Sequence, residues 1–290
     1  MASKPEIYDA RTKRMPKAWR GILRSIHRAA LRLARGHRNP RRLAAAVAMS
    51  VVKEHRHLTY RELEAYVEER PDLVGMCRMA GPPSKSCLHA MSCTLAEEGH
   101  GFMQRVLTAT AEFHAEDDIV GDSTGMCTDT KGTWVTPKYG TTSVRRFVKL
   151  HILAHPRGHI LAFAVTGYRG ADIAQLPRMP RCVRDSTGVA AFDAIYGSRE
   201  ICRIIEESGR VPVIDPKRNA SPRGFTAYAR MIRRSREDPA GFRADYSCRA
   251  LVESIFSVMK RRTGKFVRAR SLPTRTVELF ARVLCYNMAA

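Results

Sequence analysis

A stretch of mixed apolar and polar residues at 245–262 contains residue types that phosphate chemistry uses. Four polar residues recur in it at helical spacing: Tyr246, Arg249, Glu253 and Lys260. With Tyr246 at the origin and about 100° per residue, the other three lie at roughly 300°, 340° and 320°. The apolar residues lie on the opposite side, which predicts an amphipathic helix that packs on a core. One carboxylate therefore lies among cations that can grip phosphate, unless the stripe is simply a solvated charged face.

Two aspartates precede this helix at the ends of predicted strands. Residues 118–125 form a strand that ends in an acidic turn with Asp122, and residues 189–193 form a strand with Asp193 at its carboxyl end. Between them, residues 147–154 and 159–166 predict a hairpin with its turn at 155–158. A short helix at 172–176 follows the hairpin. After Asp193 come a helix capped by Ser198 and ended by Gly209, and a strand at 211–215.

This order predicts an α/β chain with a mixed sheet, as in RNase H-like domains, in which carboxylates at strand ends and on a crossing helix converge. The spacing Tyr246-x2-Arg249-x3-Glu253-x6-Lys260 resembles the YREK signature of the DDE-class insertion-sequence transposases. Residues 122–125 resemble the first aspartate motif of that family, residues 192–198 resemble the second, and residues 283–288 resemble its terminal helix. Two departures concern loop shape: Ala194-Ile195 replaces the usual Lys-Gly or similar pair, and Gly197 replaces an acidic residue.

The resemblance implies that Asp122, Asp193 and Glu253 are the catalytic and metal-binding residues. Two Mg²⁺ ions, which Mn²⁺ can replace, would activate the nucleophile and stabilise the leaving alkoxide. Oxygen ligands suit this hard ion and thiols do not. The resemblance also implies that Tyr246, Arg249 and Lys260 contact the transposon end. Tyr246 is equally well explained as a helix-packing aromatic, whereas a solvated pair is the less favoured explanation of the two cations.

Other polar residues of this region have simpler explanations. Asp118 lies on the same strand side as Asp122 and is the first substitute to test, but a turn or surface role is expected. The same role is expected for Asp117, Asp129, Asp172 and Asp215. His151 is expected to be a packed or hydrogen-bonded strand histidine rather than a neighbour of the metals.

The first third of the chain predicts a small all-helical domain. Helices are expected at 17–35, at 40–52 with Asn39 as N-cap, from a capping box at Thr59 and Glu62, and from 87 towards 107. Helix, loop and helix in a basic region suggest a helix-turn-helix, and residues 58–63 and 83–89 resemble the region before the catalytic domain of archaeal and bacterial DDE transposases. Any small helical bundle has such loops. In this interpretation residues 1–111 bind DNA, with contacts from Lys85, Ser86 and His89, and residues 112–290 are catalytic.

The composition agrees with a nucleic-acid partner. The chain has 290 residues and a formal net charge of +22, which implies a polyanion, although basic ribosomal-type proteins share this property. Its eight cysteines include no Cys-x2-Cys pair, so neither a zinc site nor a disulfide framework is indicated. No apolar run approaches the roughly 20 residues that span a bilayer, and the amino terminus lacks the apolar segment of a secretory peptide. We expect a prokaryotic, cytoplasmic, nucleoid-associated protein.

The sequence thus predicts a metal-dependent DNA transposase that cleaves at transposon ends and joins the 3′ hydroxyl to target DNA. Its partner would be double-stranded DNA, at terminal inverted repeats and target sites, bound by a homodimer or higher homo-oligomer. Two alternatives stay open. One is a non-catalytic, domesticated DNA-binding protein, and the other is an RNase H-like nuclease without strand transfer.

Overall fold

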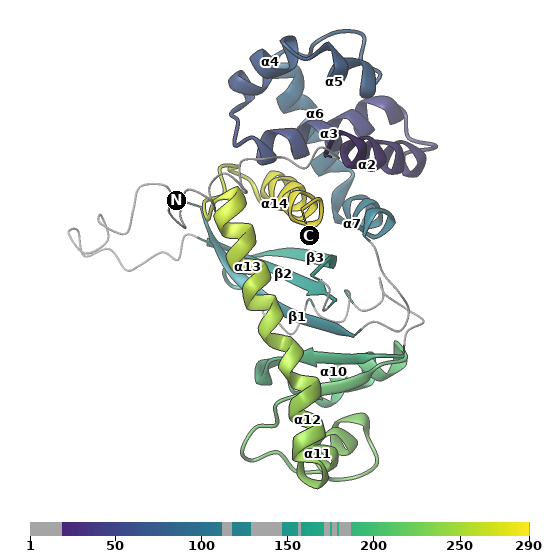
Figure 1. Ribbon diagram of the computed structural model, residues 1–290, viewed down its shortest axis with the longest axis vertical. Coiled ribbons are helices and arrows are strands. Elements are labelled where there is room, and N and C mark those ends of the chain that lie inside the picture. Colours follow the sequence, from purple (N-terminus) through teal and green to yellow (C-terminus); the bar gives the residue numbers. More distant parts are fainter. Residues whose placement is uncertain are drawn as a thin grey trace, which may run out of the picture.

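A computed structural model describes residues 19–111, 118–128, 147–155, 158–170, 175, 179 and 187–289. It shows an elongated α/β molecule in which a mixed sheet lies between a group of amino-terminal helices at one end and α10, α11 and α12 at the other (Figure 1). The predicted short helix at 172–176 lies almost wholly outside the described residues, as do Asp117, Asp129 and Asp172. None of the helices in the described ranges is long and apolar enough to cross a membrane.

The sheet has the mixed arrangement that the sequence predicts. Its strands are β1 (Ile119–Cys127), β2 (Phe147–Ala154), β3 (Ile160–Gly167), β4 (Val189–Phe192) and β5 (Val211–Ile214), in the spatial order β3-β2-β1-β4-β5. Antiparallel pairing joins β1, β2 and β3, whereas β4 is parallel to both β1 and β5. The predicted hairpin is confirmed. This architecture is consistent with an RNase H-like fold.

The amino-terminal helices are α2 (Trp19–Leu33), α3 (Pro40–His55), α4 (Tyr60–Glu68), α5 (Pro71–Met76), α6 (Lys85–Glu97) and α7 (Gly99–Thr110). Both predicted caps are confirmed, since the Asn39 side chain accepts from the Arg42 backbone and Thr59 and Glu62 form a reciprocal capping box. A single helix from 87 towards 107 is wrong. Gly99, with φ of +76°, begins a separate helix, because glycine adopts this left-handed backbone without steric cost.

The loop that was predicted to join a helix-turn-helix also differs from the expectation. The short helix α5 follows α4 almost directly, and a further segment separates it from the cap of α6 at Ser84. The helices α3, α4 and α6 pack on one another. A DNA-binding role for this group therefore remains a prediction that rests on its sequence and exposed residues.

The carboxyl-terminal helices are α10 (Arg199–Glu207), α11 (Ala227–Glu237), α12 (Pro239–Tyr246), α13 (Ala250–Thr263) and α14 (Leu272–Asn287). One continuous helix over 245–262 is not what the structure shows. A 3-10 turn, η4 (Ser247–Arg249), tightens the backbone between α12 and α13, so the first two polar residues of the stripe precede α13. The three elements still run as one rod across the sheet (Figure 1).

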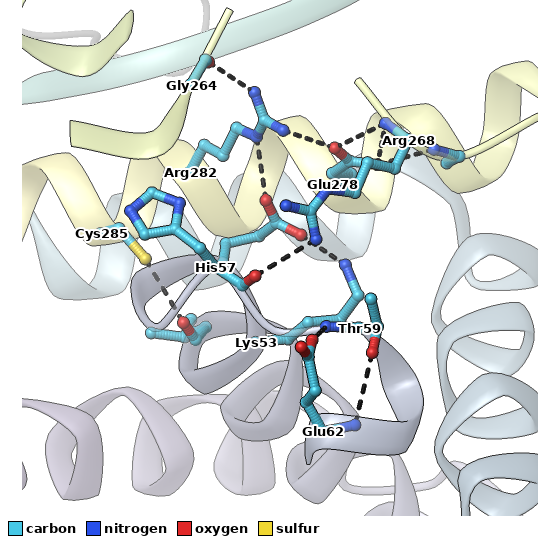
Figure 2. A network of polar contacts seen from close by, with 12 residues as sticks. Lys53, His57, Thr59, Glu62, Gly264, Arg268, Glu278, Arg282 and Cys285 are labelled. Atoms are coloured by element: carbon cyan, nitrogen blue, oxygen red, sulfur yellow. Dashed lines mark hydrogen bonds and ion pairs between the residues drawn. The ribbon is translucent and has the colours of Figure 1, made fainter. Parts of the chain in front are cut away.

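The last helix, α14, joins the two parts of the molecule. It packs on α3, α6 and α7 as well as on β3 and α13, and it is buried along most of its length. Arg282 of α14 is only 2% exposed and binds Glu54 of α3 at 3.0 Å and Glu278 at 2.6 Å. It also donates to the carbonyl of Gly264, just after α13, at 2.8 Å (Figure 2). Residues on both sides of the predicted domain boundary near residue 112 therefore share one buried network, in which Arg282 binds Glu54 and Glu278.

Candidate active site

The register of the sheet places the two aspartates side by side. Gly121 of β1 pairs with Phe192 of β4 in parallel, so Asp122 in β1 and Asp193 directly after β4 lie at the same level of the sheet. A methyl group on Gly121 would lie 2.1 Å from Cε1 of Phe192. Only glycine at position 121 therefore leaves room for the Phe192 ring. The sequence alone did not identify Gly121 as important for the site.

Backbone amides hold one oxygen of each aspartate. The amide of Ser123 donates to Oδ1 of Asp122 at 2.7 Å, and the amide of Ala194 donates to Oδ1 of Asp193 at 2.5 Å. The second bond caps a 3-10 turn at Ala194–Tyr196, which is the local form taken by the unusual second motif. Each carboxylate is thereby oriented, and its other oxygen, Oδ2, is directed towards η4.

Arg249 links all three predicted carboxylates. Its Nη2 lies 3.4 Å from Oδ2 of Asp122 and 3.5 Å from Oδ2 of Asp193. Its Nη1 lies 3.2 Å from Oε1 of Glu253, one turn along the helix. The three acids, contributed by β1, the end of β4 and α13, therefore converge on one guanidinium. The sequence predicted the convergence of the acids but not that Arg249 would lie between them.

Lys260 fixes the other half of α13 on the same strand. Its Nζ donates to Oγ1 of Thr124 at 2.6 Å. Since side chains two residues apart in a strand share a face, Thr124 lies on the face of β1 that carries Asp122. The alternation of a strand would have predicted this position for Thr124, although not its partner. Arg249 and Lys260 thus hold the helix over β1 from either side of Glu253.

The acids differ in their access to solvent. The Asp122 side chain is 20% exposed, whereas that of Glu253 is 65% exposed. Burial raises the pKa of Asp122, and the negative charges of Asp193 and Glu253 act in the same direction, while the Ser123 amide and Arg249 oppose them. Burial also lowers the pKa of Lys260. The site is thus a partly buried group of acids beside which added positive charge is favourable.

The chemical type of the ligands, carboxylate oxygens, suits a hard divalent cation. Three carboxylates from three elements each present an oxygen to the same positive charge, and oxygen is the ligand that Mg²⁺ prefers. Among the described residues, however, no three His, Cys, Asp or Glu side chains are arranged to hold a metal ion together. The acids are held apart around the guanidinium of Arg249, which supplies the positive charge in this arrangement.

Of the remaining predicted residues, Tyr246 lies near the acids, since burial raises the pKa of its hydroxyl group and the charges of Arg249, Asp193 and Asp122 also act on that pKa. Tyr246 ends α12 and is half-buried, while Lys85, Ser86 and His89 lie exposed on the first turns of α6. These three belong to the end of the molecule that is opposite α11 and α12 (Figure 1). His89 contacts the ring of Tyr60 edge-on.

The simpler explanations of two other residues are supported by their contacts. Oδ1 of Asp118 accepts from the amide of Val189 at 2.8 Å, so this side chain ties the starts of β1 and β4 together. His151 is buried, and its Nε2 lies 2.9 Å from Oγ1 of Thr166. Neither residue joins the acids around Arg249.

Comparisons with known proteins show what the chain is similar to. The model of a family described as "Transposase DDE domain" matches residues 114–288, well over half of the chain. Over 100 residues, the chain is 39% identical to the probable transposase for insertion sequence element ISA1214 of Archaeoglobus fulgidus. That match covers 34% of this chain and 30% of the relative, so the chain spans less than a third of the relative's length. No solved structure matches the chain significantly.

Proposed function

Because the chain belongs to the DDE transposase family, we propose that it cleaves DNA at the ends of an insertion sequence and joins the 3′ hydroxyl to target DNA. The observation that carries the proposal is the convergence of Asp122, Asp193 and Glu253 on one cation. A protein that only binds DNA gains nothing from three carboxylates clustered beside phosphate. The proposal assigns catalysis and metal binding to these three acids.

Two Mg²⁺ ions, or Mn²⁺ in their place, would activate the attacking hydroxyl and stabilise the leaving alkoxide when bound. Asp122, Asp193 and Glu253 would hold them through the oxygens that face Arg249. Binding then requires the guanidinium to leave the space between the acids. A phosphate of the DNA offers it a new partner, because guanidinium groups bind phosphate through paired hydrogen bonds. Arg249 would thus neutralise the acids before DNA arrives and hold the strand afterwards.

Lys260 and Tyr246 complete the proposed contacts with the cleaved strand. Lys260 lies on the same face of α13 as Glu253, and its ammonium group donates to Thr124. This hydrogen bond holds the ammonium group beside β1, where it would meet a backbone phosphate next to the cut. Tyr246 precedes Arg249 by three residues and is half-buried, which leaves part of its ring available to a displaced base. Both residues would position the strand rather than bind metal.

The amino-terminal helices are proposed to recognise the transposon end. Lys85, Ser86 and His89 are exposed on the first turns of α6, where a recognition helix makes its contacts. In the full chain, replacing Lys85 and His89 by alanine should reduce discrimination between end DNA and random DNA in a competition binding assay. Unchanged discrimination would place end recognition elsewhere.

The net charge of +22 supports double-stranded DNA as the partner. We propose that a homodimer or larger homo-oligomer assembles on it in the nucleoid.

The test uses the purified chain, Mg²⁺ and DNA that flanks its own coding sequence. Asp122→Asn, Asp193→Asn and Glu253→Gln should each abolish nicking while DNA affinity stays equal or rises slightly, because a negative charge near phosphate is lost. Asp118→Asn is the matched control, since asparagine keeps the oxygen that accepts from Val189. It should cleave normally.

Mapping the products also separates the alternatives. Joined products identify a transposase, whereas nicks without joining identify a nuclease. Binding without either product identifies a DNA-binding protein that has kept the fold. Full cleavage by any one of the three acid variants would contradict the assignment of the site.

A further inference from the structure

A cavity of about 500 Å³ lies where the amino-terminal helices meet the start of α14. Its walls come from α3, α4 and α6 on one side and from residues 268–281 on the other. It is thus bounded by segments from both parts of the chain, next to the network around Arg282 that Figure 2 shows. Cavities of this volume are in the range that binds small organic ligands.

The two carboxylates that line the cavity already have a partner on each oxygen. Glu54 binds Lys53 at 2.6 Å and Arg282 at 3.0 Å through different oxygens. Glu278 binds Arg282 at 2.6 Å, and its oxygens also accept from the backbone amides of residues 268 and 269. Two carboxylates and two cations thus balance one another. These acids are poor ligands for a further cation.

Hydrogen-bond donors, in contrast, are in surplus on the cavity wall. Ser92 is only 7% exposed and lines the cavity, yet no described residue forms a hydrogen bond with its hydroxyl group. Thr94, two residues further along α6, instead donates to the carbonyl of Ala90 at 3.0 Å. Because buried polar groups normally have a hydrogen-bond partner, the Ser92 hydroxyl group is available to an acceptor atom of a ligand.

Two arginines line the cavity without an ion pair to any residue that the structure describes. Arg270 is exposed and has no hydrogen bond either to the described part of the chain. Arg268 is also exposed, and it donates to the carbonyl of His57 at 3.2 Å (Figure 2). The start of α14, capped by Ser271, adds the positive end of a helix dipole. The solvent side of the cavity therefore favours an anion.

The rest of the wall suits a flat organic body. The Tyr60 ring is oriented by Lys53, whose Nζ lies 5.3 Å from the ring centre, and by His89, which contacts the ring edge-on. Val277 and Ala281 add apolar surface from α14. A phosphate ion alone would leave most of a cavity of this volume empty. An aromatic ring system with acceptor atoms would cover this wall and reach the free hydroxyl group.

We propose that the cavity binds a mononucleotide. Its phosphate would lie between Arg268, Arg270 and the start of α14, and its base would lie against Tyr60 and accept a hydrogen bond from Ser92. The ligand is a free, small phosphate ester, because a cavity bounded by α3, α4, α6 and α14 has no room for a duplex. This site goes beyond the proposed action on DNA and would stand if the chain cleaved no DNA.

The test titrates the purified full chain by calorimetry with each of the four nucleoside 5′-monophosphates, with the matching nucleosides and with inorganic phosphate. At least one nucleotide should bind about tenfold more tightly than its nucleoside and than phosphate, because only the nucleotide fills both parts of the cavity. At a concentration of about 100 times its Kd, that nucleotide should raise the thermal midpoint by roughly 4 °C.

Substitutions locate the binding. Ser92→Ala should weaken it about fivefold without changing the net charge, since the buried donor is lost. Arg270→Ala should weaken it about tenfold, since a charged hydrogen bond to phosphate is lost. Ser25→Ala and Arg35→Ala are the matched controls, because Ser25 already donates to the carbonyl of Gly21 and both residues lie outside the cavity. Both controls should bind within about twofold of the native chain.

Failure of all four nucleotides to bind would overturn the proposal. Equal weakening by Arg270→Ala and Arg35→Ala, with no effect of Ser92→Ala, would also overturn it. That result would mark a general attraction of anions to a basic protein rather than a site. Melting each variant without ligand verifies that it is folded, so a loss of binding reports on the cavity.

Discussion

Replacing Arg282 by methionine should destabilise the protein far more than the same change at a surface arginine with similar partners. Arg282 is 2% exposed and binds Glu54 and Glu278, whose side chains are 8% and 5% exposed. It also donates to the carbonyls of Gly264 and Phe266. Methionine fills much of the volume but leaves two buried carboxylates and two carbonyls without this donor.

The expected cost follows from what is left unpaired. Removing one partner of a buried ion pair costs about 3–5 kcal/mol, because the remaining charge stays buried. For a chain of this length the entropy of unfolding is roughly 0.6 kcal/mol per degree, so the thermal midpoint should fall by roughly 5–8 °C. Circular dichroism melts at pH 7 measure this shift.

Arg203 provides the control. It also binds two glutamates, Glu200 and Glu207, but its side chain is 54% exposed. Arg203→Met should therefore cost less than about 1 kcal/mol. Adding Glu54→Gln and Glu278→Gln to Arg282→Met should recover part of the loss, since the stranded charges disappear. Equal melting shifts for Arg282→Met and Arg203→Met would refute the reasoning.

Three further predictions concern the site and the pH dependence of stability. Gly121→Ala should lower stability by about 1–3 kcal/mol and slow cleavage, because its methyl group meets the Phe192 ring; Phe192→Leu in the same chain should restore part of both, as melts and nicking assays would show. Lys260→Ala and Arg249→Ala should each slow end cleavage by about 10²-fold through lost positioning, and recovery of the native rate for Lys260→Ala on titrating Mg²⁺ would contradict this. Burial and the nearby cations lower the pKa of His55 to about 4, so the folded state resists a proton that the unfolded chain accepts below about 6.5. Stability should therefore fall as pH drops from about 6.5 towards 4, and His55→Gln should lessen this fall by about 1–3 kcal/mol in denaturant titrations at several pH values.

The sequence predicted the parts of the site that local patterns determine. Asp122 and Asp193 follow apolar runs that predict buried strands. Once β1 and β4 are neighbours in the sheet, the two aspartates must lie close together. Angular position on a helix placed Arg249 and Glu253 on one stripe. The angular position gives no distance from Arg249 to Asp122 of β1. It also assumes a regular helix, whereas the structure has a 3-10 turn at Ser247–Arg249. The central position of Arg249 among the acids therefore required the tertiary structure.

Residues whose roles depend on distant neighbours were missed. Gly121 matters only because Phe192, far along the chain, packs over it. The break at Gly99 was missed because the apolar residues on both sides continue at helical spacing. In each case the local pattern was compatible with several tertiary surroundings.

The central position of α14 has a consequence for the order in which a nascent chain can fold. A ribosome synthesises α2 to α7 first, yet α3, α6 and α7 pack on a helix that ends at Asn287. Glu54 likewise meets Arg282 only after more than two hundred further residues have been added. The faces of these helices that pack on α14 must therefore stay uncovered for roughly 9–35 seconds at ordinary rates of about 5–20 residues per second. Packing of the amino-terminal helices is therefore completed late in synthesis. It is completed when Arg282 of α14 binds Glu54 and donates to the carbonyl of Gly264, just after α13.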